Sequence, residues 1–272
     1  MPDLPTLLPM VALLLVIGAF AGVIAGLLGV GGGIVLVPAF FYMFGHLGYG
    51  SAQLMQVCLA TSLATIVVTS ARSVMSHHKR GAVDWEVLRG WWPYIAFGAA
   101  LGMLTAAQLR SITLQAIFGV LALIAGLYMA FGRSHWRLGS EMPKGARRAG
   151  IGGAVGFFSV LMGIGGGSFG VPVMSLYNMA IHRAVATAAG FGLIIAVPSV
   201  IGFLLLKIDA PPPYSIGAVN LPAFGIVIAM TLLTAPLGVR LAHWMDPAPL
   251  KRAFAVFITL VALNMLRKVA GF

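Results

Sequence analysis

The feature that most constrains this chain is a cluster of glycines that occurs twice, each time inside a long apolar stretch. The first copy reads GLLGVGGGIVLVP over residues 26–38, and the second reads VLMGIGGGSFGVP over residues 160–172. Apart from proline, glycine is the residue that most weakens a helix interior. Both copies therefore predict an interrupted helix in a region whose composition otherwise favours a continuous one.

The composition predicts an all-α integral membrane protein. Hydrophobic residues make up 60% of the 272 residues and charged residues 8%, against roughly 25% charged in soluble domains. About eight apolar stretches approach or exceed the ~18 residues typical of a membrane-spanning helix. They cover residues 7–28, 52–76, 87–109, 112–132, 149–162, 184–206, 221–242 and 253–269, with shorter pieces at 34–45 and 168–181. The first stretch lacks a basic start and a small-residue cleavage site, so we expect it to persist as a helix.

The net charge of +11 has a membrane explanation. In a soluble protein it would suggest a nucleic-acid partner, but here Lys and Arg gather in loops at helix ends, as they do in membrane proteins. We therefore expect no nucleic-acid partner, and a lipid bilayer around the protein. Cys58 is the single cysteine, which excludes an intrachain disulfide and a cysteine-based metal site.

The chain also resembles itself beyond the glycines. The glycines at 29, 31, 32 and 33 and Pro38 align with those at 163, 165, 166 and 167 and Pro172. Ala-Thr at 60–61 aligns with Ala-Thr at 186–187, and Gly-Ala-Val at 81–83 with Gly-Ala-Val at 217–219. We infer a duplicated unit, with a first repeat at 1–132, a linker at 133–148 and a second repeat at 149–272.

The distribution of Lys and Arg indicates that the two repeats are inverted. Residues 72–89 and the linker 133–148 are both rich in Lys and Arg, which predicts a cytoplasmic position, whereas only Arg110 lies between the helices at 87–109 and 112–132. In the second repeat the bias is exchanged: 207–215 holds one Lys, and 240–252 holds three basic residues. Each repeat would then be a glycine-broken helical hairpin plus three transmembrane helices, in a bacterial inner membrane, with the N-terminus outside. If the first element instead crosses once, the N-terminus is cytoplasmic and the inversion fails.

Broken helices inside a bilayer survive only where protein or a watery cavity partners their backbone. A helix that restarts after each cluster would aim N–H groups and partial positive charge at the gap, which favours anions. Paired broken helices in inverted repeats are typical of secondary transporters. The alternative is that the glycines serve close helix packing. A dinucleotide or phosphate-binding loop is excluded because the acidic residue and the Lys-Ser/Thr pair those motifs need are missing.

These motifs, together with Ala-Thr-Ser-Leu at 60–63 and HHKRGAVDW at 77–85, resemble the TauE/SafE family of sulfite and organosulfonate exporters over nearly the whole chain. The resemblance implies export of small sulfur-containing anions such as sulfite, sulfoacetate or a related organosulfonate, driven by an ion gradient. The second repeat departs from the first at Ala188, where the first has Ser62.

The predicted substrate site combines backbone and side-chain donors near the two breaks. Hydroxyl and amide groups on the helices after the breaks suit an oxyanion, although Ser and Thr can instead bond their own helix carbonyls. Arg183 would attract an anion, but could instead reach towards the membrane interface. The predicted substrate-binding residues are Gly31, Gly32, Gly33, Gln56, Thr61, Ser62, Thr65, Gly165, Gly166, Gly167, Ser168, Arg183 and Thr187; Asn178 is a further polar candidate.

No cofactor, resident metal or catalytic residue is predicted. The six acidic residues all fall in expected loops or helix ends, so no buried carboxylate is a candidate proton relay. Coupling to H+ or Na+ stays open, as does a homodimer. Two other functions also stay open: an anion channel of the same architecture, and an intramembrane enzyme, for which no serine has an expected nearby base.

Overall fold

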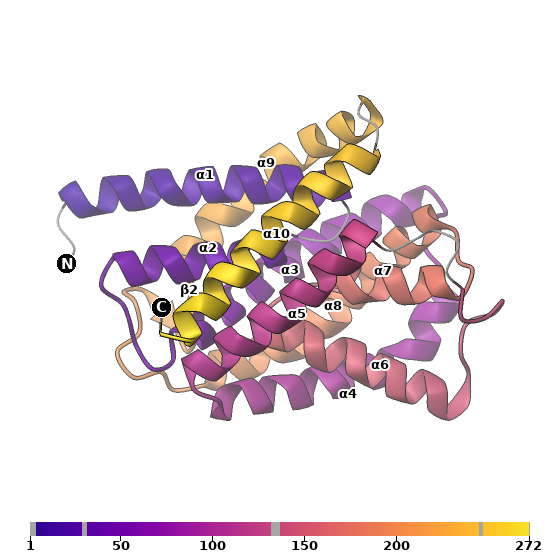
Figure 1. The fold of residues 1–272 in the computed structure, drawn as a ribbon, viewed down its shortest axis with the longest axis horizontal. Coiled ribbons are helices and arrows are strands. Elements are labelled where there is room, and N and C mark those ends of the chain that lie inside the picture. Colours follow the sequence, from indigo (N-terminus) through magenta and orange to yellow (C-terminus); the bar gives the residue numbers. More distant parts are fainter. Residues whose placement is uncertain (1–3, 29–31, 132–136, 245–246, 272) are drawn as a thin grey trace.

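The computed structural model describes residues 4–28, 32–131, 137–244 and 247–271. Helices dominate these residues, which confirms the predicted all-α class (Figure 1). The first half holds α1 (Leu4–Leu28), α2 (Gly33–His46), α3 (Leu54–Lys79), α4 (Trp85–Gln108) and α5 (Ser111–Phe131). The second half holds α6 (Gly145–Leu161), α7 (Gly167–Leu176), α8 (Ile181–Leu205), β1 (Ser215–Ile216), β2 (Val219–Asn220), α9 (Leu221–Trp244) and α10 (Pro247–Val269).

The helices follow the predicted apolar stretches closely. By length and hydropathy alone, four helical segments among the described residues could cross a membrane: 54–79, 111–131, 181–205 and 221–238. Two helices begin clearly before their predicted apolar stretches: α6 begins at Gly145, inside the predicted linker 133–148, and α10 begins at Pro247, against a predicted start at residue 253. α6 extends into the basic stretch because Arg147 and Arg148 are good helix formers.

Each glycine cluster joins two helices that form a hairpin. α2 runs back towards the side of the molecule on which α1 begins, as Figure 1 shows. α7 is short, with 10 residues, and follows α6 after the second cluster. In the described residues, α2 and α7 are the two short helices, and both begin inside the bundle.

The helices of the two halves pack on each other in pairs. α1 packs along α9 and α6 along α4, while α3 crosses α8 and α5 lies against α10. Numbering the five helices of each half in order, the first helix of one half packs on the fourth of the other. Small residues permit the close approach: a Cβ on Gly156 would lie 2.8 Å from the Ala99 backbone N, and one on Gly22 would lie 2.8 Å from the Thr231 Cα.

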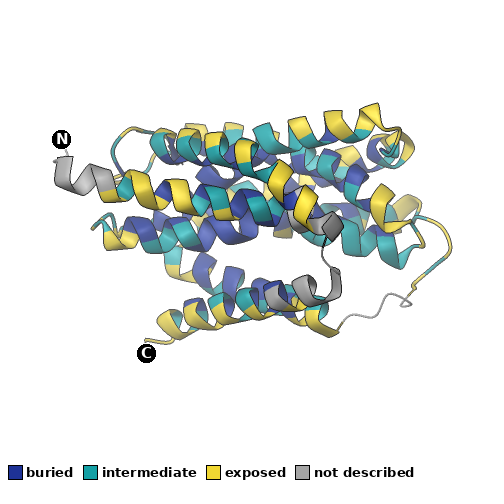
Figure 2. Cartoon of the chain, turned by 90° about the horizontal axis from the view of Figure 1, so that it is seen from above, coloured by how far each residue is buried: buried dark blue, intermediate teal, exposed yellow. Residues whose placement is uncertain are grey.

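The outside of the bundle is apolar. Exposed residues lie around its periphery and buried residues inside it (Figure 2). Large hydrophobic side chains such as Phe97, Ile124 and Leu233 are exposed to 66%, 57% and 69%. Many exposed large apolar side chains are unfavourable in water and favourable in lipid, so this surface fits a multi-pass membrane protein.

Two opposite ends of the bundle can be defined. The terminal face carries the start of α1, the end of α10 and the loops 47–53, 109–110 and 206–220. The contacts that join it include a hydrogen bond from the Met55 N–H to Ser111 Oγ (2.9 Å) and one from the Asp209 N–H to Gln53 Oε1 (2.8 Å). The linker face carries the loops 80–84, 137–144 and 177–180, with the Leu138 N–H donating to the Leu176 carbonyl (2.8 Å).

Candidate functional site: two broken helices that meet in the core

The second glycine cluster first ends a helix. Gly163 has φ +60°, a left-handed conformation that glycine adopts without strain. Its N–H donates to the Val160 carbonyl (2.9 Å) and the Ile164 N–H donates to the Ser159 carbonyl (2.9 Å). This pair of bonds is the Schellman motif, which closes a helix C-terminus. Gly163 therefore stops α6 in the middle of the bundle; its counterpart Gly29 lies outside the described residues.

The same clusters then start new helices, as the sequence predicted. α2 follows Gly32 (φ −67°, ψ −6°) and α7 follows Gly166 (φ −63°, ψ −14°), and neither start has a side-chain cap. The first N–H groups of each helix have no partner within the helix. Their partial positive charge is thus concentrated at two points in the core, as an anion-binding site requires.

The two breaks lie against each other. A Cβ added to Gly33 would lie 2.6 Å from the Gly163 carbonyl oxygen and 3.0 Å from the Ile164 Cα. The first turn of α2 therefore touches the start of the second break, just after α6, although the two segments are far apart in sequence. The two interrupted segments that the sequence predicted therefore contact each other in the structure. Gly31 lies outside the described residues.

In this conformation the glycines are covered by protein. A Cβ on Gly166 would collide with the Phe191 side chain and lie 2.7 Å from the Ala188 carbonyl oxygen. A Cβ on Gly165 would lie 3.3 Å from the Ile66 side chain. Gly32 is equally close to Ala21, and Gly167 is buried as the first residue of α7. The packing role considered from sequence is therefore real at these positions, and the centre is closed.

Ser62 stabilises the closed packing of the two breaks. Its Oγ donates to the Gly163 carbonyl oxygen (2.7 Å), and the serine is fully buried. The bond ties α3 to the left-handed residue of the second break. The aligned position in the second repeat is Ala188, which has no hydroxyl, so the second repeat cannot make the equivalent hydrogen bond.

Thr61 and Thr187 make equivalent contacts that sequence reasoning missed. Thr61 Oγ1 accepts a hydrogen bond from the Asn220 N–H (3.0 Å), and Thr187 Oγ1 accepts one from the Asp84 N–H (3.0 Å). Asn220 in turn caps α9 through the Ala223 N–H (3.0 Å), and Asp84 caps α4 through the Val87 N–H. The signal was present: Asp84 and Asn220 each follow the repeated Gly-Ala-Val, in the position of an N-cap.

Three further predicted residues are engaged by nearby backbone. Gln56 Nε2 donates to the Leu109 carbonyl (2.6 Å) at the end of α4, which leaves its acceptor Oε1 buried without a partner. Thr65 Oγ1 donates to the Ser62 carbonyl of its own helix (2.7 Å). Asn178 has φ +67° just after α7 and shapes its C-terminus. The Gln56 and Thr65 side chains therefore bond to the backbone of this conformation.

Arg183 lies at the linker face and is paired. Its Nη2 lies 2.9 Å from Asp84 Oδ2, and the two side chains are 58% and 19% exposed. The Asp84 backbone also donates to Thr187. Arg183 thus belongs to a polar cluster at the start of α4.

Two buried hydroxyls flank the second break without a partner. Ser168 Oγ lies in the first turn of α7, and Ser159 Oγ lies in the last turn of α6; neither has a hydrogen-bond partner in the described structure. A buried polar group without a partner costs stability. Ser168 was predicted as a site residue, whereas Ser159 was not, because it precedes the glycines.

Proline adds acceptors beside these donors. Pro38 and Pro172 lie inside α2 and α7 and have no N–H. The carbonyl oxygens of Ile34 and Ser168, four residues earlier, therefore lack the usual helical donor. Each break therefore offers N–H groups without a partner in the helix and, in the same first turn, a carbonyl oxygen freed by proline.

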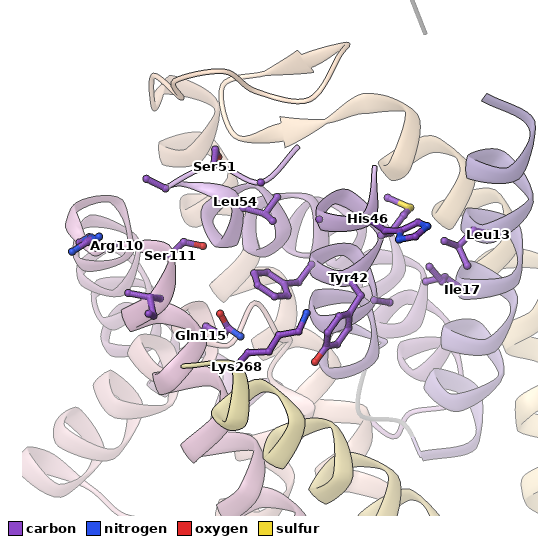
Figure 3. A pocket seen from close by; sticks show the side chains of 17 residues that line it. Leu13, Ile17, Tyr42, His46, Ser51, Leu54, Arg110, Ser111, Gln115 and Lys268 are labelled. Atoms are coloured by element: carbon purple, nitrogen blue, oxygen red, sulfur yellow. The ribbon is translucent and has the colours of Figure 1, made fainter. Parts of the chain in front are cut away.

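A cavity of about 1000 Å³ lies elsewhere, at the terminal face (Figure 3). It runs along α2, reaches Ala39 and contains none of the predicted site residues. Ala39 is six residues from Gly33, or about 9 Å along a helix. The breaks are therefore enclosed while a cavity approaches them from one side.

The fold and the apolar surface define a multi-pass membrane protein, and the comparisons with known proteins place it among the membrane transporters. A family model described as sulfite exporter TauE/SafE matches residues 14–265. The chain belongs to this family, which confirms the resemblance seen in the motifs.

Curated relatives agree with this class. A probable membrane transporter protein of Haemophilus influenzae is 32% identical over 95% of this chain and 98% of its own. A probable membrane transporter protein of Methanocaldococcus jannaschii is 24% identical over 93% of this chain and 94% of its own. No solved structure matches the chain.

Proposed function

We propose that this protein is a secondary transporter that exports small sulfur-containing anions, such as sulfite, sulfoacetate or a related organosulfonate. The family description supports the substrate class. The observation that carries the mechanism is the packing of the first turn of α2 on the second break, where a Cβ added to Gly33 would lie 2.6 Å from the Gly163 carbonyl oxygen. The uncapped starts of α2 and α7 belong to these two breaks. Two such ends can share one oxyanion through N–H groups from both repeats.

Transport then requires the two breaks to separate, because they are closed by packing and by the bond from Ser62 to Gly163. In this proposal the two halves are inverted repeats that alternate access to the centre. The exchanged pairing of α1 with α9 and α6 with α4 supports the inversion. So do the equivalent bonds of Thr61 and Thr187 to the caps of α9 and α4.

The proposed orientation places the linker face in the cytoplasm of a bacterial inner membrane and the terminal face outside. The basic residues of 72–89 and of 133–148 support it. For a coupling ion, the carbonyl oxygens freed by Pro38 and Pro172 are the candidate Na+ ligands, since no acidic residue in the described part of the chain lies inside the bundle. Coupling to H+ is the alternative.

Flux measurements in liposomes test the function. Purified protein is expected to move labelled sulfite or sulfoacetate with saturable initial rates, and to exchange external label against internal unlabelled anion. Exchange of this kind is typical of a carrier. A linear, non-saturating conductance would instead assign an anion channel, and movement of a cation alone would overturn the anion site.

Ser168 provides a variant test of the central site. Ser168→Ala removes a buried hydroxyl that has no hydrogen-bond partner among the described residues, so the melting temperature should stay the same or rise. The anion concentration at half-maximal flux should increase about five- to tenfold if the lost hydrogen bond contributes about 1 kcal/mol or slightly more. Ser199→Ala is the control, because Ser199 Oγ donates to the Ile195 carbonyl of its own helix (2.7 Å).

A further inference from the structure

The cavity at the terminal face has the lining of an anion site. It is open on one side and is lined by α1, the outer part of α2, the starts of α3 and α5 and the end of α10. Arg110, Lys268 and His46 line it, and no Asp or Glu is among its lining residues. Asp209, an acidic residue of a terminal-face loop, contacts Gln53 through its backbone and does not line the cavity.

Lys268 is held in position at this cavity. Its Nζ lies 4.4 Å from the centre of the Tyr42 ring, a cation–π contact. Figure 3 shows the side chain extending between Tyr42 and Gln115. Gln115 is 6% exposed and donates one Nε2 hydrogen to the Met265 carbonyl (3.1 Å), which leaves the other for a ligand.

Two helix starts and two helix ends meet at this cavity, since α2 ends at His46 and Lys268 lies in the last turn of α10. α3 begins at Leu54 and α5 at Ser111, and both residues line the cavity. The Met55 N–H is used by Ser111 Oγ (2.9 Å), which fixes the two starts side by side. The Leu54 N–H donates to the Ser51 carbonyl (3.2 Å) and the Ser111 N–H to the Ala52 carbonyl (2.9 Å). Because helix starts and helix ends carry partial charges of opposite sign, the positive potential of the cavity comes from its basic side chains.

We infer that this cavity is a second anion site, a vestibule that binds a small oxyanion at the terminal face on its way from or to the central breaks. The inference rests on the proposed function in taking the bound anion to be the transported one. The site differs from the centre in using cationic side chains, so it draws anions by charge and is sensitive to salt. Its innermost α2 residue, Ala39, lies on the helix that Gly33 begins.

Calorimetric titration of the full chain in a neutral detergent tests the vestibule, with sodium sulfate as the probe. The double variant Arg110→Gln/Lys268→Gln should weaken sulfate binding about five- to thirtyfold, since each screened charge contributes on the order of a few-fold. Both residues are exposed, so the fold should persist. The control is Lys79→Gln/Arg89→Gln, which removes two exposed charges nearer the linker face and should change the affinity less than twofold.

Binding that is unchanged in the Arg110/Lys268 variant overturns the vestibule. A second titration, with phosphatidylglycerol in mixed micelles, separates the sources of the anion. If the wild type binds that lipid but not sulfate, and the double variant loses lipid binding, the cavity holds a headgroup and the vestibule is wrong. If the wild type moves no anion in liposomes but binds sulfate through Arg110 and Lys268, the proposed function fails while the site stands.

Discussion

At the scale of single residues, Gly33 matters because it has no Cβ, which lets the backbones of the two breaks approach each other closely. A Cβ at Gly33 would lie 2.6 Å from the Gly163 carbonyl oxygen and 3.0 Å from the Ile164 Cα. Both are backbone atoms, so relieving the overlap would require the backbone to shift. We expect Gly33→Ala to cost about 1–3 kcal/mol, as overpacking does elsewhere, and to abolish flux. Thermal unfolding in detergent and liposome flux measure the two effects.

The control is Gly225→Ala in α9, where a Cβ would meet nothing within 4 Å. Because alanine favours a helix over glycine by up to about 1 kcal/mol, this variant should be unchanged or slightly more stable and fully active. Equal behaviour of the two variants would contradict the close approach of the breaks.

The sequence predicts which residues belong to the candidate site, but it does not predict which backbone groups they contact. The repeated glycines and the aligned Thr61 and Thr187 are visible in the printed chain. Their partners are not, because Asn220 and Gly163 lie more than a hundred residues from Thr61 and Ser62. Helical periodicity reports which face a residue occupies but not which backbone group meets it across the bundle.

At the scale of elements, the two threonines hold two helix caps. Thr61→Val and Thr187→Val keep the shape but leave the N–H of Asn220 or Asp84 without its acceptor. Each should destabilise by about 1–3 kcal/mol. Thr105→Val is the matched control, since Thr105 Oγ1 bonds its own helix at Leu101 (2.8 Å) at an exposed site. Thermal unfolding measures all three, and threonine variants as stable as the control would rule out the capping role.

The two caps differ in one charge, which gives a separate prediction. Asp84→Asn copies the cap that Asn220 already makes in the second repeat, and it removes the carboxylate charge beside Arg183. Because Arg183 is 58% exposed, the ion pair contributes only about 0–1 kcal/mol. We expect Asp84→Asn to unfold within about 1 kcal/mol of wild type, whereas Asp84→Ala should lose about 1 kcal/mol more with the cap. Equal melting temperatures for Asn and Ala would argue against the cap.

Elements were easier to predict than the way they pack. Long apolar runs fix the helices, and the glycine clusters fix the two interruptions. The start of α6 at Gly145 was missed because the stretch is basic, and charge obscures a helix that leaves the bilayer. The pairing of α1 with α9 and of α6 with α4 depends on complementary small residues in both helices, which a single sequence does not reveal as partners.

At the scale of the whole molecule, the orientation in the membrane follows from the two faces. The linker face carries Ser140 and the terminal face carries Ala270, and both are exposed. In a Cys58→Ala background, an impermeant maleimide should label Ala270→Cys in intact cells, and Ser140→Cys only after the membrane is opened. Unaltered Cys58 is a control that should stay unlabelled, since it is fully buried. The reverse pattern would invert the orientation and turn the vestibule towards the cytoplasm, where it would receive an exported anion instead of releasing it.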